Sequence, residues 1–213
     1  MSKPVAGLVD YDMGNLKSVS KALEKVGMQV RPVGSPGQMK DLDALVLPGV
    51  GSFRVAVKNL KSKNLFSPIR EWIRSEKPFL GICLGYQLLF ERGKEGGGNE
   101  KGLGIFKGKV QKFTASKNLK VPHMGWNRVR RTDQPRAKGI FKGIPDGSCF
   151  YFVHSYFPVP RDEKITAGRT VYGKKFSSCI AWDHSFACQF HPEKSGDNGL
   201  QVLKNFSGNI QAC

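Results

Sequence analysis

The stretch PFLGICLGYQLLF, residues 78 to 90, decides how the first half of the chain folds. Its first five residues form a short apolar run typical of a buried strand, and the residues after Cys83 repeat apolar side chains at helical spacing. Cys83 is therefore expected on the turn between a strand and a helix, with Gly81 and Gly85 two positions to either side. Because glycines lack a Cβ, they let a strand and a helix pass closely, as in a nucleophile elbow.

The Cys83 thiol has two interpretations on this local pattern. A helix N-terminus directs its N–H groups and the positive end of its dipole at the residue before it, which favours a reactive thiolate. Against this, cysteine is among the most often buried residues and commonly only fills a core. A second group is needed to decide between a nucleophile and a packing residue.

Strands and helices alternate on the N-terminal side of this stretch. Short apolar runs at 5–9, 28–33 and 44–48 predict strands. Between the first two, apolar residues recur every three or four positions from Asn15, a favourable helix cap, to Gly27, a helix stop. Strands separated by helices indicate a parallel sheet, and ligands of such sheets bind beyond the carboxyl ends of the strands.

The pattern changes from about residue 100 onward. Short β-like segments separated by turns predict a mixed or antiparallel extension of the sheet. A last helix is expected around Leu203, capped by Asp197 or Asn198. The predicted fold class is α/β: a mostly parallel open sheet flanked by helices, with an additional mixed or antiparallel β portion in the C-terminal half. The length of 213 residues suits one domain over 1–213.

The charge balance is the unusual feature of the composition. With 34 Lys and Arg against 17 Asp and Glu, the formal net charge is +17. A basic excess raises affinity for polyanions, so a nucleic-acid-binding module is an alternative of a different class. The positive residues are spread from Lys3 to Lys204, however, and the densest stretch, 127–139, lacks the spaced aromatic residues of a base-stacking surface. We expect no nucleic-acid partner; an acidic protein, a phosphorylated metabolite or plain solvation fits the charge as well.

Membrane and metal sites have little support in the sequence. No window approaches the roughly 18 apolar residues that a membrane span needs, and the first residues lack the apolar core of a secretory signal. We expect a cytoplasmic protein with no membrane partner. The five cysteines are an odd number without a C-x-x-C pair, which argues against a disulfide framework and a zinc ribbon. No cofactor and no metal are expected, and His154 and His184 are interpreted as structural.

A second motif supplies a base for Cys83. The apolar run FACQF leads directly into His191, Pro192 and Glu193. Residues two apart in an extended segment share a side, so the imidazole and the carboxylate can meet while the proline fixes the turn. Cysteine chemistry needs an imidazole to move the thiol proton and a carboxylate to orient that imidazole. Taken alone the motif also fits an exposed turn, but together with the elbow it favours a catalytic triad.

Three motifs, in this order and spacing, resemble the class I, or triad, glutamine amidotransferase family over essentially the whole chain. They are PGVG at 48–51, GICLGYQ at 81–87 and QFHPEKS at 189–195. Three others narrow the resemblance to the family of glutaminase subunits of imidazole glycerol phosphate synthase, from histidine biosynthesis: DYDMGN (10–15), HMGWN (123–127) and FVHSYF (152–157). The resemblance implies an enzyme that hydrolyses L-glutamine to glutamate and ammonia.

The resemblance also implies roles for single residues. Cys83 would attack the side-chain amide of glutamine, His191 would protonate the departing ammonia and then activate water, and Glu193 would hold His191. The oxyanion would be bound by the N–H groups of Leu84 and Val50. In the family, the loop that carries the second donor keeps the oxyanion site incomplete until the partner is bound and loaded, which is a form of gating.

Further residues match positions that contact the substrate or the partner in the family. The expected substrate contacts are Gly49, Gln87, Glu95, Ser155 and Tyr156. The expected partner interface consists of Asn15, His123, Met124, Trp126 and Lys194. For Gln87 the alternative is a polar residue near a helix start, and for Met124 and Trp126 it is the core.

Ammonia chemistry implies a partner as well. In neutral water ammonia becomes protonated and stops being a nucleophile, so an enzyme that uses it must deliver it by a dry route. The resemblance implies delivery to a (β/α)8-barrel cyclase subunit, in a heterodimer that makes imidazole glycerol phosphate and AICAR. A paralogous subunit that feeds a sugar amidotransferase of surface-polysaccharide biosynthesis is an alternative with the same chemistry. A stand-alone cysteine hydrolase is a third.

Overall fold

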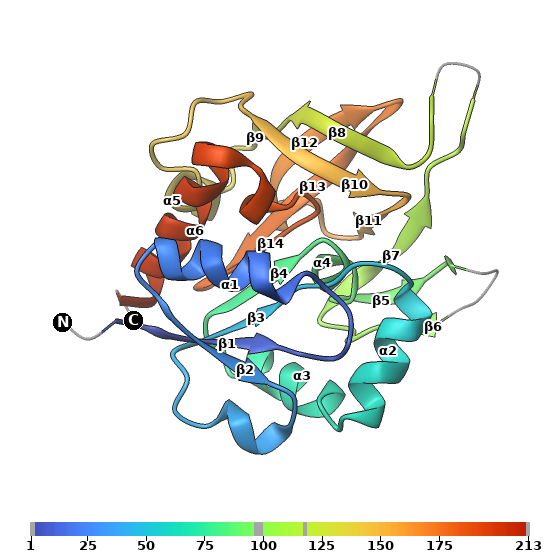
Figure 1. Cartoon of the computed structure of the whole chain (residues 1–213). Helices are drawn as coiled ribbons and strands as arrows, with labels where there is room; N and C mark the ends of the chain where they lie inside the picture. The colour runs from blue at the N-terminus through green and yellow to red at the C-terminus, as the bar shows by residue number, and fades with distance from the viewer. Residues whose placement is uncertain (1–2, 96–99, 117–118, 212–213) are drawn as a thin grey trace.

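The central sheet joins strands from both ends of the chain. The computed structural model describes residues 3–95, 100–116 and 119–211. Five neighbouring strands run parallel: β2 (Gln29–Val33), β1 (Val5–Val9), β3 (Ala44–Leu47), β4 (Phe79–Ile82) and β14 (Ser185–Cys188). Three antiparallel strands extend them: β13 (Lys174–Trp182), β12 (Thr166–Tyr172) and β9 (Arg130–Arg131). The expected α/β class, with a parallel first half and an antiparallel extension, is confirmed (Figure 1).

Helices cover both faces of this sheet (Figure 1). On one face lie α1 (Leu16–Lys25), α5 (Pro135–Ile140) and α6 (Gly196–Gln211), and on the other α2 (Phe53–Ser62) and α3 (Phe66–Arg74). Successive side chains of a strand point to opposite faces, so in β3 Val46 packs in the cluster beneath α1 and α6 and Leu45 in the cluster beneath α2 and α3. Burial of both faces explains why the strands read as unbroken apolar runs. None of the helices in the described ranges is long and apolar enough to cross a membrane.

The expected cap is confirmed for α1 but not for α6. At α1 the Asn15 Oδ1 accepts a hydrogen bond from the Ser18 N–H at 3.2 Å, and Gly27 follows the helix with φ +92°, as expected. At the other end α6 begins at Gly196, directly after the 3₁₀ turn η4 (Pro192–Lys194). The expectation that Asp197 or Asn198 caps this helix is wrong, because both residues already lie in its first turn.

The segment after Cys83 departs from the expected long helix. The helix α4 (Leu84–Gln87) is a single turn, and the chain then enters β5 (Phe90–Gly93). Leu88 and Leu89 form a turn, and Phe90 begins β5, which is defined by its pairing with β7 (Phe106–Lys112). The second sheet has the order β11 (Tyr156–Pro160), β7, β5, β6 (Glu100–Lys101). The remaining elements are the antiparallel pair β8 (His123–Arg128) and β10 (Cys149–His154) and the 3₁₀ turns η1 (Pro36–Met39) and η3 (Glu163–Ile165).

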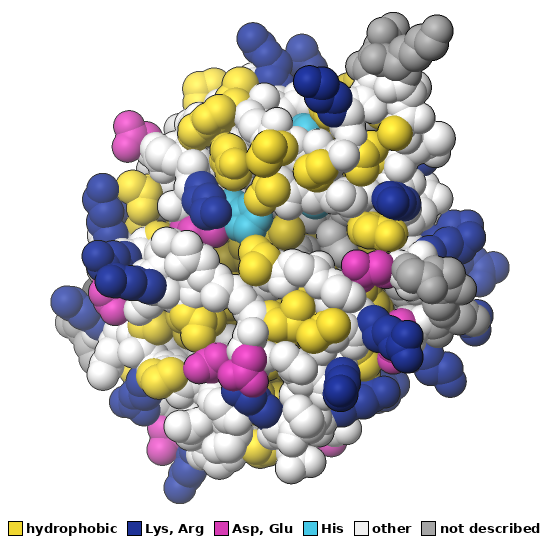
Figure 2. Space-filling view, turned by 45° about the vertical axis from the view of Figure 1, so that its right-hand side comes forward, with side chains coloured by type: hydrophobic (Ala, Val, Ile, Leu, Met, Phe, Trp, Pro, Cys, Tyr) yellow, Lys and Arg dark blue, Asp and Glu magenta, His cyan; other side chains and the backbone are white. Residues whose placement is uncertain are grey.

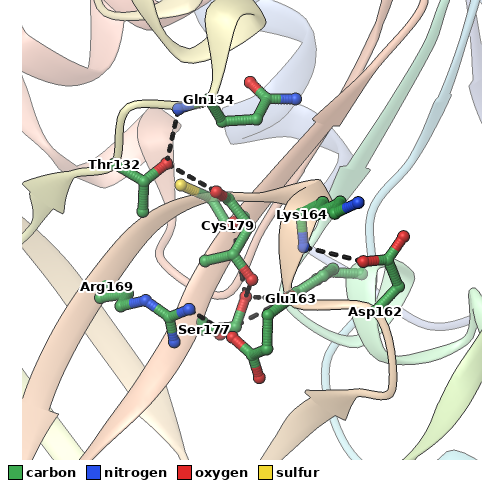
Figure 3. A network of polar contacts seen from close by, with 10 residues as sticks. Thr132, Gln134, Asp162, Glu163, Lys164, Arg169, Ser177 and Cys179 are labelled. Atoms are coloured by element: carbon green, nitrogen blue, oxygen red, sulfur yellow. Dashed lines mark hydrogen bonds and ion pairs between the residues drawn. The ribbon is translucent and has the colours of Figure 1, made fainter.

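A network of polar contacts attaches the segment before α5 to the antiparallel strands (Figure 3). The Thr132 Oγ1 donates to the Thr166 carbonyl at 2.6 Å. The Gln134 Nε2 also donates to the Ala181 carbonyl at 2.7 Å. The Thr166 Oγ1 in turn lies 3.1 Å from the Ser177 Oγ. Buried polar groups cost free energy unless they are paired, and these bonds pair them where α5 packs on the sheet.

Candidate active site

Three neighbouring parallel strands bring the predicted reactive residues to one edge of the sheet. The strand β3 is followed by Pro48 and Gly49, β4 by Cys83, and β14, after two intervening residues, by His191. Because β3, β4 and β14 are adjacent and parallel, their carboxyl ends lie side by side. Residues separated by more than one hundred positions in the sequence therefore meet there.

Cys83 has the backbone geometry of a nucleophile elbow. Its φ of +54° and ψ of −101° lie where residues with a Cβ are rarely found, and such strain persists only when neighbours hold it. The Cys83 N–H donates to the Cys188 carbonyl at 2.8 Å, which fixes the turn to β14. At Gly85 a Cβ would lie 1.8 Å from the Leu47 carbonyl oxygen, so only glycine lets α4 approach β3 this closely. The flanking glycines thus have the steric role predicted for an elbow.

His191 and Glu193 form a buried pair beside this turn. The His191 Nδ1 lies 2.8 Å from the Glu193 Oε1, and both side chains are almost fully buried. The His191 Nε2 is buried and makes no hydrogen bond within the described residues. Burial lowers the pKa of His191, but the nearby Cys83 sulfur and the Glu193 carboxylate outweigh it and raise the pKa to about 10. The imidazole therefore holds a proton at neutral pH that it can transfer to a leaving group.

The expected oxyanion site is closed by a hydrogen bond between its two sides. The Leu84 N–H donates to the Gly49 carbonyl oxygen at 3.2 Å. In a trans peptide the C=O and N–H point in opposite directions, so the Val50 N–H, which belongs to the same peptide, points away from Leu84. The Tyr11 hydroxyl donates to the Pro48 carbonyl at 2.8 Å and holds the preceding peptide. The N–H groups of Leu84 and Val50 do not converge on one point in this conformation.

A cavity of about 510 Å³ lies next to Cys83 and contains most of the expected substrate contacts. Gln87, Glu95, Ser155 and Tyr156 belong to its lining. The described residues that line it are Val50, Gly51, Ser52, Cys83, Leu84, Gln87, Glu95, Pro122, Val153, His154, Ser155 and Tyr156. Gly49 is not among them, since its carbonyl faces the Leu84 N–H. The volume is within the range of pockets for small molecules.

The Glu95 carboxylate already has a structural partner. Its Oε2 accepts hydrogen bonds from the Ser52 Oγ at 3.0 Å and from the first N–H of α2, that of Phe53. The N-terminal N–H groups of a helix have no partner within the helix, and a carboxylate there also complements the helix dipole. Glu95 thus caps α2 from a distant loop while it lines the cavity.

Gln189 is a candidate that the sequence motif left without a role. It is fully buried, and its Nε2 lies 3.5 Å from the Cys83 Sγ. Its Oε1 accepts a hydrogen bond from the Gln87 Nε2 at 3.2 Å, and the same Gln87 nitrogen donates to the Tyr156 carbonyl at 2.9 Å. Gln87 is accordingly buried and fixed. Gln189 follows the end of β14 directly, and the expected extended segment through Glu193 is replaced by the 3₁₀ turn η4, so strand alternation alone would not have identified Gln189.

The residues expected at a partner interface divide into two groups. Met124 and Trp126 are exposed on β8, by 66% and 58%, and Asn15 and Lys194 are exposed as well. The core alternative for Met124 and Trp126 is therefore wrong. The assignment of His123 to the interface surface is also wrong, because its side chain is 2% exposed. On β8 the side chains alternate, so His123 points to the opposite side from Met124.

His123 and His154 form a buried pair, of which His154 also lines the cavity. The His123 ring stacks between Tyr172 and Phe152, with ring centroids 4.0 and 4.8 Å away. The His123 Nδ1 lies 2.9 Å from the His154 Nε2, and the His154 Nδ1 lies 2.8 Å from the Tyr156 carbonyl oxygen. Burial lowers the pKa of His123 to about 4 and that of His154 to about 3, so both rings are neutral at pH 7.

The basic side chains do not gather over the centre of the face in Figure 2. Lys and Arg lie mostly around its margin, while hydrophobic and uncharged atoms, with histidine among them, occupy most of the middle. Several cations are also compensated locally, as in the ion pairs of Lys63 with Asp12 and of Arg136 with Asp183. On this face the basic side chains are distributed rather than concentrated.

Comparisons with known proteins agree with this geometry. The family model described as glutamine amidotransferase class-I matches residues 7–209. A protein of Sulfurimonas denitrificans named imidazole glycerol phosphate synthase subunit HisH is 49% identical over 94% of this chain and 96% of its own length. The protein of the same name from Moorella thermoacetica is 48% identical over 96% and 94%. The solved structure of PurLQS from Thermotoga maritima superposes with a TM-score of 0.72 at 21% identity, covering 96% of this chain and 97% of that chain, which shows a shared fold.

These matches decide between the alternatives left open by the sequence. Neither a sugar amidotransferase recipient nor a nucleic-acid-binding module is favoured by relatives of this similarity and coverage. The family match spans all three strand ends that carry Cys83, His191 and Glu193. The chain belongs to the class-I glutamine amidotransferase family of glutamine-hydrolysing enzymes and, within it, to the HisH subunits of imidazole glycerol phosphate synthase.

Proposed function

We propose that this chain hydrolyses L-glutamine with Cys83, His191 and Glu193 and passes the ammonia to a (β/α)8-barrel cyclase subunit. The two form a heterodimer that makes imidazole glycerol phosphate and AICAR. The relatives are named as subunits of a synthase, which supports the assembly. The observation that carries the chemistry is the buried His191–Glu193 pair, 2.8 Å apart, beside a cysteine on a strained turn.

The first half of the reaction forms a thioester. The Cys83 Sγ attacks the side-chain amide carbon of glutamine, the C–S bond forms, and the carbonyl electron pair moves to oxygen. When that pair returns, the C–N bond breaks and the amide nitrogen takes the proton of the His191 Nε2, so that ammonia leaves. A protonated His191, favoured by its raised pKa, suits this first proton transfer.

The second half releases glutamate. Neutral His191 now removes a proton from water while the water oxygen attacks the thioester carbon. The C–S bond then breaks, its electron pair returns to the Cys83 sulfur, and glutamate leaves. His191 ends protonated again, and the Glu193 carboxylate stabilises the imidazolium in each half.

The closed oxyanion site supports activation by the partner. In both halves negative charge develops on the substrate oxygen, and preorganised N–H donors normally bind it. Here the Leu84 N–H is occupied by the Gly49 carbonyl, and the Val50 N–H points away from it. A rotation of the Gly49–Val50 peptide would free the first donor and turn the second toward it. We propose that binding of the loaded cyclase favours this rotation.

The position of the exposed apolar residues supports a docking surface next to the site. Met124 and Trp126 lie on β8, which pairs with β10, and Trp126 lies opposite Tyr151 in that pair. The β10 strand ends at His154, which lines the cavity. A partner that covers β8 would therefore also cover the mouth of the cavity and exclude water from the ammonia.

Titration of the glutaminase activity with the cyclase tests this proposal. The isolated chain should hydrolyse glutamine slowly, and the cyclase with its nucleotide ligand should raise kcat by about 10²-fold or more, the size of an oxyanion-donor effect. Full activity of the isolated chain would contradict the gating. No glutaminase activity under any condition would contradict the triad.

A further inference from the structure

The environment of the Cys83 sulfur includes a donor that the triad does not account for. The Gln189 side chain is fully buried, and its Nε2 lies 3.5 Å from the Cys83 Sγ. Among the titratable groups, His191, Tyr11 and Cys188 interact electrostatically with Cys83, and the Cys83 Sγ also lies 4.0 Å from the Val153 carbonyl oxygen. Gln189 is a neutral donor added to them, on the segment that also carries the catalytic histidine.

The orientation of the Gln189 amide follows from its neighbours. The Tyr156 carbonyl can only accept, so the group of Gln87 that lies 2.9 Å from it must be the NH₂. The same NH₂ faces Gln189 at 3.2 Å, so Gln189 must present its Oε1 there. The other end of the Gln189 amide, which faces the sulfur, is then its NH₂.

The Tyr156 carbonyl oxygen also accepts a hydrogen bond from a series of donors that begins at Asn127. The Asn127 amide is oriented by donating to the Val171 carbonyl at 3.0 Å, so its NH₂ also donates to the His123 Nε2 at 3.1 Å. The His123 proton is therefore on Nδ1 and bonds the His154 Nε2, which leaves the His154 proton on Nδ1 to bond the Tyr156 carbonyl. Each donor in this buried chain has one available orientation.

We propose that Gln189 is a further catalytic residue, whose side-chain N–H stabilises negative charge on the Cys83 sulfur, with Gln87 setting the orientation of its amide. The sulfur is negative before attack on the substrate and again when the C–S bond of the thioester breaks and its electron pair returns to sulfur. A donor at the sulfur favours the thiolate in the resting enzyme and improves the leaving group in deacylation. The inference rests on the proposed function in one respect, that Cys83 is the nucleophile.

The alkylation of Cys83 in the absence of substrate tests the first effect. We expect Gln189→Met, which keeps the length and removes the donor, to move the pH midpoint of iodoacetamide alkylation of Cys83 upward by about one unit. That shift is roughly a tenfold loss of thiolate below the midpoint. Gln189→Glu should move it further, because a carboxylate repels the thiolate. Peptide mass spectrometry separates Cys83 from the other thiols.

The control for this experiment is Gln201→Met. Gln201 lies on α6, where its Nε2 donates to the Asn205 Oδ1 at 2.8 Å, so the chemical change is identical but remote from the sulfur. This variant should keep the parent midpoint. A merely structural role for Gln189 predicts no ordered shift from the parent through Met to Glu. Equal midpoints in the parent and a folded Gln189→Met protein would overturn the proposal.

Acid-quenched turnover in the complex with the cyclase tests the second effect. Gln189→Met should accumulate the glutamyl thioester on Cys83, visible as a mass increase of the protein, because sulfur has become a poorer leaving group. If Gln189→Met does not fold, Gln189→Glu serves in its place, with recovery of deacylation as the pH falls and the carboxyl group becomes a donor. Unchanged thioester levels in a folded variant would overturn this part. Glutamine hydrolysis at the parent rate by Cys83→Ala in the same complex would instead count against Cys83 as the nucleophile, and so against the proposed function.

Discussion

The hydroxyl oxygen of Tyr11 occupies the space that a Cβ on Gly49 would need, 2.1 Å from the ideal position of that atom. Tyr11 is fully buried at the end of β1, and its hydroxyl donates to the Pro48 carbonyl. The loop after β3 is therefore held on its inner side by a residue from the neighbouring strand. Glycine at position 49 is a steric requirement of this contact.

A double-mutant cycle tests the contact. Gly49→Ala should lower the free energy of unfolding by about 1–3 kcal/mol, because the new methyl group overlaps the hydroxyl. Tyr11→Phe should cost about 0.5–1.5 kcal/mol through the lost hydrogen bond. Urea denaturation of the double variant should show a loss smaller than the sum, since the phenylalanine leaves room for the methyl group. Additive losses would contradict the steric explanation.

The Val50 N–H is expected to complete the oxyanion site after the peptide rotates. Val50→Pro removes this N–H, so the cyclase-stimulated kcat should fall by about 10²–10³-fold. Val50→Ala keeps the N–H and is the matched control, with stimulated kcat close to the parent. Steady-state glutamine hydrolysis at saturating cyclase distinguishes them. A Val50→Pro protein that is stimulated as strongly as the parent would show that another donor binds the oxyanion.

Cys83→Ala separates the two halves of the enzyme. The variant should lose glutamine-dependent synthesis in the complex but keep synthesis from added ammonium salts, because the cyclase site does not use the thiol. Product formation with each nitrogen source, measured at a pH where some ammonia is unprotonated, checks this. Loss of both activities would mean that Cys83 supports the fold or the interface rather than the chemistry.

The buried histidine pair predicts a loss of stability in acid. In the folded protein the pKa values of His123 and His154 are about 4 and 3, and in the unfolded chain they are about 6.5. Below pH 6.5 the unfolded chain therefore binds protons that the folded protein does not, and stability is lost as the pH falls from about 6.5 toward 4. Urea unfolding at pH 7.5 and pH 5 should show a smaller acid loss for His154→Asn. His184→Asn removes an exposed histidine and should behave as the parent.

Trp126 is expected to bind the partner without supporting the fold. Its side chain is 58% exposed, so Trp126→Ala should leave the thermal midpoint nearly unchanged. Aromatic residues in the centre of interfaces often cost 2 kcal/mol or more when truncated, so the Kd for the cyclase should rise by about 30-fold. Val171→Ala, which truncates another exposed apolar side chain on β12, is the control. Equal affinity of the two variants would place the cyclase elsewhere.

The parallel strands and the meeting of Cys83 with His191 were predictable because local patterns determine them. Buried strands read as apolar runs, and parallel neighbours must align their carboxyl ends, so Cys83 and His191 could be placed together from the sequence. The strand β5 could not be predicted in this way. Its sequence, FERG, has no strand pattern, and the helical spacing of the apolar residues before it continues to Phe90, so its pairing with β7 is what defines it.

The burial of His123 and the contact of Gln189 have different physical origins. Alternate residues of a strand face opposite sides, so HMGWN cannot form one surface, which buries His123 and exposes Met124. Gln189 lies just beyond the end of β14, where the chain bends before His191. The burial of His123 follows from the period of two, but the contact of Gln189 with the Cys83 sulfur depends on the packing of β4 against β14.

The hydrogen bonds of Glu95 would couple the binding of any ligand that contacts its carboxylate to the order of α2. One of its carboxylate oxygens anchors the first turn of α2, and the same side chain lines the cavity. A ligand that binds the Glu95 carboxylate would compete with the Phe53 N–H for it. A ligand that leaves this hydrogen bond in place would stabilise the first turn of α2. By linkage, a ligand that changes the fraying of α2 at Phe53 must have its own affinity changed by that fraying to the same extent.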